Sequence, residues 1–314
     1  MKCPIVFASD AAYAMPLATA LRSLVDCNQR HWPLEFHVIN DGIPDVLRHK
    51  VEASLHPGSA TIHWVEIDLA PFARMLTMPG ISKMTFARLM IPNVMPESVS
   101  RILYIDSDTL TLGDLSSLFV EELGDAPFGA VLDGIDPLIK QNDPRCAGAP
   151  RVASYFNAGV LLINLPAWRN CRISERALEF LEAHPETQFA DQDALNVAGD
   201  RLWHALDAQW NYQKHREAQI EELDATLRPR IIHFVTGAKP WRAKVLNLNS
   251  DLYDRYRNRT NFSRRLPQRF GDFFIQMLAR VSRQMNRFSW WRRVRLQLRY
   301  PAAAPRARSA AEPS

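Results

Sequence analysis

The sequence predicts an α/β domain built on a mostly parallel, doubly wound sheet. Over the first two-thirds of the 314 residues, short apolar segments alternate with amphipathic ones, a spacing typical of successive βαβ units. The composition, 47% hydrophobic and 23% charged, is that of a globular protein with a sizeable core. Because ligands bind such sheets beyond the carboxyl ends of the strands, the residues that follow each strand are the first candidates for function.

Three strands and two helices form the first part of the predicted domain. Apolar runs predict strands at Ile5–Ala8, Phe36–Ile39 and Ile62–Ile67, the first two apolar enough to be buried on both faces. Amphipathic periodicity predicts helices at Tyr13–Cys27 and Pro44–Leu55, the second with proline in its first turn.

The second part of the domain repeats the alternation. We expect strands at Arg101–Ile105, Phe128–Leu132 and Gly159–Leu165, a helix at Ser174–Ala183 and another over residues 192–199. The first of these strands ends in an acidic run, which makes its carboxyl end the most informative position in the chain.

That acidic run lies in ILYIDSDTL, residues 102–110. If a strand ends at Ile105, Asp106 leaves its carboxyl edge, and Asp108, two residues on, points the same way. Two converging carboxylates repel each other unless a cation lies between them, and hard oxygen ligands suit Mn²⁺ or Mg²⁺, whose open positions accept diphosphate oxygens. Such pairs also cap turns, so this pattern alone leaves a structural role open.

A second segment, IIHFVTGAKPW at residues 231–241, combines a short apolar strand, His233, a loop of small residues and Lys239. A lone histidine after a strand is more often structural than a ligand. Here a loop follows whose backbone N–H groups can approach a phosphate, and a lysine that can neutralise one.

Taken together, these segments resemble the glycosyltransferase family 8 enzymes, the group of glycogenin-like and bacterial lipopolysaccharide hexosyltransferases. The resemblance spans roughly residues 4–242, and the motifs that carry it have the order and spacing of the family. They are IVFASDAAYA (5–14), TFARLMIP (85–92), ILYIDSD (102–108), YFNAGVLLINLPAW (155–168), DQDALN (191–196) and HFVTGAKPW (233–241).

The resemblance implies a GT-A fold, bound Mn²⁺ or Mg²⁺, and a UDP-hexose donor carrying glucose or galactose. By position it implies a metal site made of Asp106, Asp108 and His233. It implies UDP-sugar contacts from Ala8, Asp10, Tyr13, Arg88, Asp106, Ser107, Asp108, Gly237 and Lys239. The catalytic groups, around the hexose and acceptor, would be Asp133, Asn157, Asp191 and Gln192.

Several of these residues also have structural interpretations. Asp10 would cap the helix that follows it, and Asp191 would cap helix 192–199, a role compatible with function. Arg88 would pair with a surface acid, and Asn157 would satisfy loop backbone.

The expected activity is transfer of a hexose to a lipopolysaccharide, glycolipid or other glycan acceptor, with an α-linkage and retention of configuration. Retaining glycosidases use a carboxylate nucleophile with an acid–base partner, and no such pair is identifiable here. We therefore favour attack by the acceptor hydroxyl on the leaving-group face over a covalent route. One alternative is a nucleotidyltransferase or phosphohydrolase that uses Asp106 and Asp108, and another is a non-catalytic binding module.

The C-terminal part of the chain is basic. Residues 262–300 contain ten arginines against one acid, Asp272, beside an apolar stripe from Phe270 to Phe288 at helical spacing. We expect a catalytic domain over residues 1–260, a membrane-association helix over 261–300 and a disordered tail over 301–314.

These features also predict a location. The segregated apolar stripe favours an anionic membrane surface over nucleic acid as the partner of the basic helix. The four cysteines show no metal-knuckle or paired spacing, which fits a reducing compartment. No apolar run is long enough to span a bilayer. We therefore expect a cytoplasmic protein, peripheral on the inner face of the cytoplasmic membrane.

Overall fold

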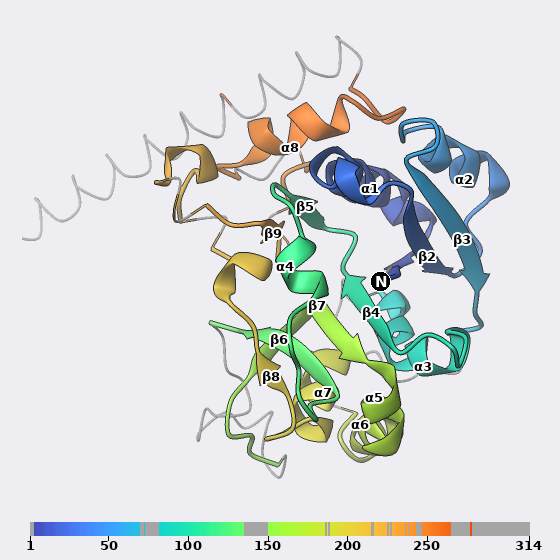
Figure 1. Cartoon of the computed structure of the whole chain (residues 1–314), viewed down its shortest axis with the longest axis vertical. Helices are drawn as coiled ribbons and strands as arrows, with labels where there is room; N and C mark the ends of the chain where they lie inside the picture. Colours follow the sequence, from blue (N-terminus) through green and yellow to red (C-terminus); the bar gives the residue numbers. More distant parts are fainter. Residues whose placement is uncertain are drawn as a thin grey trace, which may run out of the picture. The chain divides into compact units, whose positions relative to one another are not determined.

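A seven-stranded sheet in the order β3-β2-β1-β4-β7-β6-β8 runs through the computed structural model (Figure 1). Its strands are β1 (Ile5–Ser9), β2 (Leu34–Asn40), β3 (Ala60–Glu66), β4 (Arg101–Ile105), β6 (Phe128–Leu132), β7 (Phe156–Asn164) and β8 (His204–Ala205). The structure describes residues 3–69, 72, 82–134, 150–185, 187, 189–214, 217–224, 226, 228–235, 237, 239–242, 247–264 and 277. The predicted mixed α/β fold with a mostly parallel sheet is confirmed.

The order in which successive strands are added to the sheet reverses at β1. From β1 the chain builds outward through β2 to β3, and it then returns to place β4 on the other side of β1. Both β2 and β4 pair with β1 in parallel. Such a switch point leaves a crevice at the carboxyl ends of the two central strands, where ligands bind. Asp10 follows the first of these strands and Asp106 follows the second.

Strand β7 runs against the rest of the sheet, since it pairs antiparallel with both β4 and β6. It begins at Phe156, three residues before the strand predicted at Gly159–Leu165, and eight of its nine residues are buried. A strand buried on both faces is a continuous apolar run in either direction, so the pattern did not show its orientation.

Helices cover both faces of the sheet (Figure 1). One face packs on α1 (Ala14–Cys27), α2 (Asp45–Glu52) and α4 (Ser116–Phe119), around a core that includes Phe7, Phe36 and Val38. The opposite face packs on the 3₁₀ segment η4 (Lys83–Met90) and on α3 (Ile91–Val94), α5 (Leu165–Asn170), α6 (Ile173–Ala183) and α7 (Asp191–Ala198). Three layers of this kind hold the carboxyl edge of the sheet open to ligands.

A second, two-stranded sheet lies beside the first and was not predicted. In it, β5 (Thr109–Thr111) pairs antiparallel with β9 (Ile231–His233), and Thr109 lies opposite His233. Leu110 and Ile232 bury their side chains in a third core cluster, together with residues of α8 (Ser250–Arg257). The short apolar strand expected before His233 is β9, whereas β5 and the pairing between them were not predicted, because three residues hold hardly more than one alternation of side chains.

The described body continues beyond α8 to Arg264. Phe262 packs against the second core cluster, the Asn261 N–H donates to Ser54 Oγ at 3.0 Å, and Arg264 donates to the Trp241 carbonyl at 3.3 Å. Of the basic helix expected over residues 261–300, the structure describes residues 261–264 and Met277. The other residues of that segment, and the disordered tail expected over residues 301–314, lie outside the described residues. Among the described residues, no helix is long and apolar enough to cross a bilayer.

We predict that Leu110→Ala lowers the free energy of unfolding by about 2–5 kcal/mol, since the Leu110 side chain of β5 is fully buried in the third core cluster with Ile232 and residues of α8. Urea denaturation followed by far-UV circular dichroism measures the change. The matched control is Leu132→Ala, whose side chain is 57% exposed and which should change stability by about 0.5 kcal/mol or less. Equal losses in the two variants would contradict a packed third cluster.

Candidate active site

The candidate site begins where β1 and β4 end side by side. Ser107 Oγ donates to the Ala8 carbonyl at 2.9 Å, which ties the acidic turn after β4 to the end of β1. The Asp106 N–H donates to the Gly159 carbonyl at 2.8 Å, which ties the same turn to β7. Held on both sides, the carboxylates of Asp106 and Asp108 leave the carboxyl edge of the sheet.

His233 completes a potential metal site. Its Nε2 lies 3.2 Å from Asp108 Oδ1 and 3.7 Å from Asp106 Oδ2. The ligand atoms of the three residues all lie within 4.8 Å of one another. The register of the small sheet causes this approach, because β5 follows Asp108 directly and places Thr109 opposite His233.

The partners of the His233 ring select its tautomer. Nδ1 lies 3.0 Å from Asn157 Oδ1 and 3.1 Å from Asn211 Oδ1. The Asn157 amide nitrogen donates to Asp133 at 3.1 Å, and since an ionised carboxylate only accepts, the Asn157 oxygen must face the ring. Nδ1 therefore donates its proton, and Nε2 presents its lone pair to the two aspartates. A histidine that binds a metal through Nε2 has this arrangement.

Two buried cations balance the acidic turn. Arg88 places Nη2 3.0 Å from Asp106 Oδ1 and Nε 2.9 Å from Asp191 Oδ2. Lys239 donates to the carboxylate of Asp108 and, at 2.6 Å, to the carbonyl of Phe234. Both cations are only 7% exposed. The negative charge at the end of β4 is thus compensated from two other segments of the chain.

The pKa values of these groups follow from burial and pairing. Burial would raise the pKa of Asp108, but the buried ammonium of Lys239 holds it well below its usual range. Burial raises the pKa of Asp191 to about 6, and Arg88 opposes that rise. For Arg88, burial would lower the pKa, yet the two neighbouring aspartates hold it above its ordinary value. Removing one partner would leave the other as an uncompensated buried charge, which is strongly unfavourable.

A second part of the site surrounds Gln192, near the start of α7. Its amide nitrogen donates to Asp133 at 3.1 Å and to the Tyr155 hydroxyl at 3.2 Å. Its amide oxygen accepts from Asn157 at 3.1 Å and from the Ala158 N–H at 3.1 Å. Both ends of the amide are therefore oriented, and Asn157 joins this group to His233.

A third part lies after β1. Asp10 accepts from the Tyr13 N–H at 3.0 Å, which caps the short 3₁₀ segment η1 (Ala11–Tyr13), and from the Ser82 hydroxyl at 3.0 Å. The Tyr13 ring meets Trp241 edge to face at a centroid distance of 6.0 Å. The Tyr13–Trp241 ring pair and the Asp10 carboxylate thus lie together beside the carboxyl end of β1.

The structure brings most of the predicted site residues into one connected set of hydrogen bonds and ion pairs. The set consists of Arg88, Asp106, Asp108, Asp133, Asn157, Asp191, Gln192, His233 and Lys239, with Ala8 attached through Ser107. Asp10 and Tyr13 form the separate group after β1. The Gly237 carbonyl accepts from Arg242 at 3.4 Å instead.

The structural interpretations of single residues have mixed outcomes. Asp10 caps η1, the 3₁₀ segment that precedes α1, and the N-cap position of α1 itself is Tyr13. Asp191 is not a cap, because α7 begins at Asp191 itself and the carboxylate pairs with Arg88. Arg88 pairs with Asp191, which is buried, and with Asp106, which is partly buried, rather than with a surface acid. Asn157 does accept from the Gly159 N–H at 3.0 Å, and it also carries the contacts to His233 and Gln192.

Four further residues of the site were not predicted. The Tyr104 hydroxyl donates to Asp106 at 2.6 Å, and their i, i+2 spacing on one strand was a usable signal. Thr85 donates to Asp191. Tyr155 and Asn211 act through contacts with Gln192 and His233, from loops whose approach the sequence does not show.

Comparison with known proteins adds the family. The model of the family described as glycosyl transferase family 8 matches residues 4–245. General stress protein A of Bacillus subtilis is 29% identical over 275 residues, covering 82% of this chain and 94% of that protein. The lipopolysaccharide 1,2-glucosyltransferase of Escherichia coli is 24% identical over 248 residues, covering 76% of this chain and 72% of that enzyme.

Other relatives are longer, and solved structures of similar proteins are known. Glycosyltransferase GlyB of Streptococcus pneumoniae is 31% identical over 251 residues, which cover 76% of this chain but only 57% of that protein. The crystal structure of the galactosyltransferase LgtC with donor and acceptor sugar analogues is 28% identical, with a TM-score of 0.70, and the match covers 86% of this chain and 99% of that one.

We predict that Gly159→Ala weakens divalent-metal binding by about 10–100-fold, the range found when the support of a metal ligand is disturbed. A Cβ at residue 159 would lie 2.1 Å from Cε1 and 2.5 Å from Nδ1 of His233, so the ring has to move. Calorimetric titration with MnCl₂ measures the change. The matched control is Gly134→Ala, where an added Cβ meets nothing within 4 Å. Unchanged affinity in Gly159→Ala would exclude His233 as a ligand.

Proposed function

This chain belongs to glycosyl transferase family 8, and from that premise we propose that it transfers glucose or galactose from a UDP-sugar to a glycan or lipid-linked acceptor. The observation that carries the proposal is the convergence of Asp106, Asp108 and His233 at the switch point of the sheet, with ligand atoms within 4.8 Å of one another. Lipopolysaccharide is the acceptor class that we favour, because relatives that act on it cover most of this chain.

The donor set fits a divalent cation, for which Mn²⁺ is our proposal and Mg²⁺ the alternative. Two carboxylates supply hard oxygen ligands, and the His233 tautomer turns an unprotonated Nε2 toward them. A cation bound there would offset the charge of the diphosphate. The same set does not suit a structural zinc site closed by four protein ligands, since it leaves positions open for phosphate oxygens.

The surrounding residues then have separate roles. Lys239 would bind the departing diphosphate, and its ammonium, already buried next to Asp108, is placed to do so without reorganisation of solvent. Arg88 holds Asp106 and Asp191 in position. The group of Asp133, Asn157 and Gln192 would orient the hexose. Asp10 and the Tyr13–Trp241 ring pair would contact the uridine, and Ser107 and Ala8 would lie beside it.

The charge pairs also bear on the stereochemistry that we propose, which is retention. A double displacement needs a carboxylate free to attack the anomeric carbon. Asp191 is 2% exposed and is bound to Arg88 and Thr85, which favours a positioning role. We propose that the acceptor hydroxyl attacks on the face that the diphosphate leaves, and that a diphosphate oxygen takes its proton.

We predict that Asp106→Asn and Asp108→Asn each lower UDP-hexose turnover by about 10²–10³-fold, because each removes a charged group next to the leaving diphosphate. Release of UDP in the presence of MnCl₂ measures turnover. The control Asp45→Asn removes a carboxylate that is 87% exposed on α2 and should leave the rate unchanged. Full activity in EDTA, or release of UMP in place of UDP, would refute this function.

We predict that an α-configured UDP-hexose gives an α-linked product. Attack on the leaving-group face retains the configuration of the anomeric carbon. Proton NMR of the product in the first minutes of reaction reports the anomeric coupling, and the unreacted donor serves as the α reference. A β coupling in that early product would contradict the proposed mechanism.

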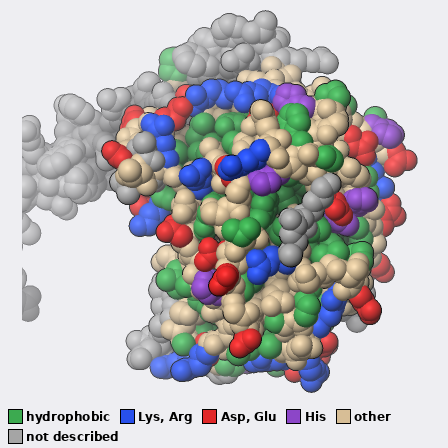
Figure 2. Space-filling view, in the orientation of Figure 1, with side chains coloured by type: hydrophobic (Ala, Val, Ile, Leu, Met, Phe, Trp, Pro, Cys, Tyr) green, Lys and Arg blue, Asp and Glu red, His purple; other side chains and the backbone are tan. Residues whose placement is uncertain are grey.

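We further propose that residues 262–300 bind the anionic inner face of the cytoplasmic membrane, where a lipid-linked acceptor is presented. Figure 2 shows a band of Lys and Arg side chains along the upper edge of the described body, where Figure 1 places α8. Arg255 there pairs with Glu221, and Arg259 pairs with Asp26. Since the described arginines are partly neutralised in this way, most of the affinity should come from the arginines beyond Arg264, at about 1 kcal/mol each near the surface.

We predict that truncation after Arg264 abolishes binding to liposomes containing phosphatidylserine. The cut lies after Arg264 because residues 261–264 pack on the body. Flotation measures binding, and the control chain lacks only residues 301–314 and should bind like the full chain. High salt should weaken binding of the full chain, since surface charges are screened. Undiminished binding of the folded, truncated chain would refute the membrane role of the segment.

A further inference from the structure

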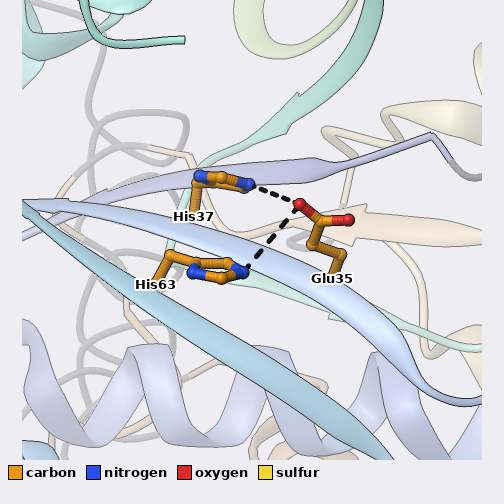
Figure 3. Close-up of side chains that lie close together, drawn as sticks. All are labelled: Glu35, His37 and His63. Atoms are coloured by element: carbon orange, nitrogen blue, oxygen red, sulfur yellow. Dashed lines mark hydrogen bonds and ion pairs between the residues drawn. The ribbon is translucent and has the colours of Figure 1, made fainter. Parts of the chain in front are cut away.

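Three side chains on β2 and β3 converge outside the site described above (Figure 3). The two strands are parallel, and their register places His37 opposite His63. Glu35 precedes His37 by two residues on the same strand, so its side chain leaves the same face of the sheet. Two imidazoles and a carboxylate therefore share one patch on two neighbouring strands.

The geometry directs both rings at one oxygen. His37 Nε2 lies 2.9 Å from Glu35 Oε1, and His63 Nε2 lies 3.9 Å from the same atom. The rings are stacked, with centroids 4.7 Å apart and an interplanar angle of 26°. All three ligand atoms lie within 4.8 Å of one another, and Figure 3 shows the two Nε2 atoms on the side of their rings that faces the carboxylate.

The charge of the cluster is negative when both rings are neutral. Among the described residues, the ion pairs of Glu35 are those with His37 and His63, and no lysine or arginine takes part. This differs from the candidate active site, where Arg88 and Lys239 pair with the aspartates. Protonating both stacked rings would place two like charges face to face. A divalent cation between the three ligand atoms would compensate the carboxylate without that repulsion.

We propose that Glu35, His37 and His63 form a second divalent-metal site, with the ligand preference of Zn²⁺. Two imidazoles and one carboxylate are a common zinc ligand set with a fourth position left to water. Tetrahedral coordination with bonds of about 2.0–2.1 Å separates ligand atoms by about 3.3 Å. The separations of 2.9 and 3.9 Å lie on either side of that value, so small rotations of the more exposed Glu35 and His63 side chains close the site.

The site is distinct from the one that binds the donor. In the sheet His37 lies opposite Val6 of β1, and Val6 lies opposite Tyr104 of β4, so His37 is two strands, roughly 10 Å, from Tyr104. The acidic turn begins two residues beyond Tyr104, and His63 lies one strand farther from it than His37 does. β3 is the edge strand of the sheet. A cation bound here would cross-link that edge to β2, so its effect should be on stability rather than on the transfer step.

Calorimetric titration with ZnCl₂ tests the proposal. The full chain is used with Asp108→Asn as background, which weakens zinc binding at the candidate active site. Added to that background, His63→Ala and Glu35→Gln should each weaken one-to-one binding at least about tenfold, since even groups that only support a ligand contribute that much. His63 and Glu35 are chosen because their side chains are 49% and 36% exposed, against 11% for His37. The control is His49→Ala, an 80% exposed histidine on α2, which should bind like the background.

A second measurement uses the wild-type background, in case Asp108→Asn fails to fold. Zinc should raise the melting temperature of the wild-type chain and of His49→Ala more than that of His63→Ala. Co²⁺ should give the visible spectrum of a tetrahedral site, lost in His63→Ala. Equal zinc affinity in the background and in His63→Ala, or no one-to-one binding below millimolar ZnCl₂, would overturn the proposal. Neither result depends on glycosyl transfer.

Discussion

The need to balance the charge of Asp106 and Asp108 constrains the structure around them. Both carboxylates lie at the carboxyl edge of the sheet, where solvation by water is reduced, and they are separated by one residue. The positive charge comes from Arg88 in η4 and Lys239 in the loop beyond β9, while His233 at the end of β9 places a neutral ring beside both carboxylates. A buried charge is tolerated only when it is paired. The positions of η4, β9 and the loop are therefore linked to the same two side chains.

The small β5–β9 sheet holds these groups beside the two aspartates. It pairs the residue after Asp108 with His233, and the Phe234 N–H donates to the Asp108 carbonyl at 3.0 Å. Packing of Leu110 and Ile232 against α8 anchors the pair. Side chains on strands are positioned more accurately than those on loops, so His233, the proposed metal ligand, keeps its place before any cation binds.

Sequence patterns predicted the elements with strong periodicity and missed those defined by pairing. The strands Arg101–Ile105 and Phe128–Leu132 have the predicted bounds. The direction of β7 depends on which neighbours it meets, and β5 exists because β9 lies beside it, so neither is a property of its own residues. The same holds in the site. The motifs located both aspartates and His233, whereas Asn211 takes its place from a contact across the fold. Local patterns report burial and turns, but not which loops meet.

Asn157 shows why the metal side and the hexose side of the candidate site cannot be treated as independent. Its side-chain oxygen faces His233 Nδ1 and the Gly159 N–H, while its nitrogen donates to Asp133 and Gln192. One planar amide thus sets the tautomer of a proposed metal ligand and the orientation of the group proposed to hold the sugar. Because the amide cannot rotate without exchanging donor for acceptor on both sides, the two halves of the site share a single arrangement.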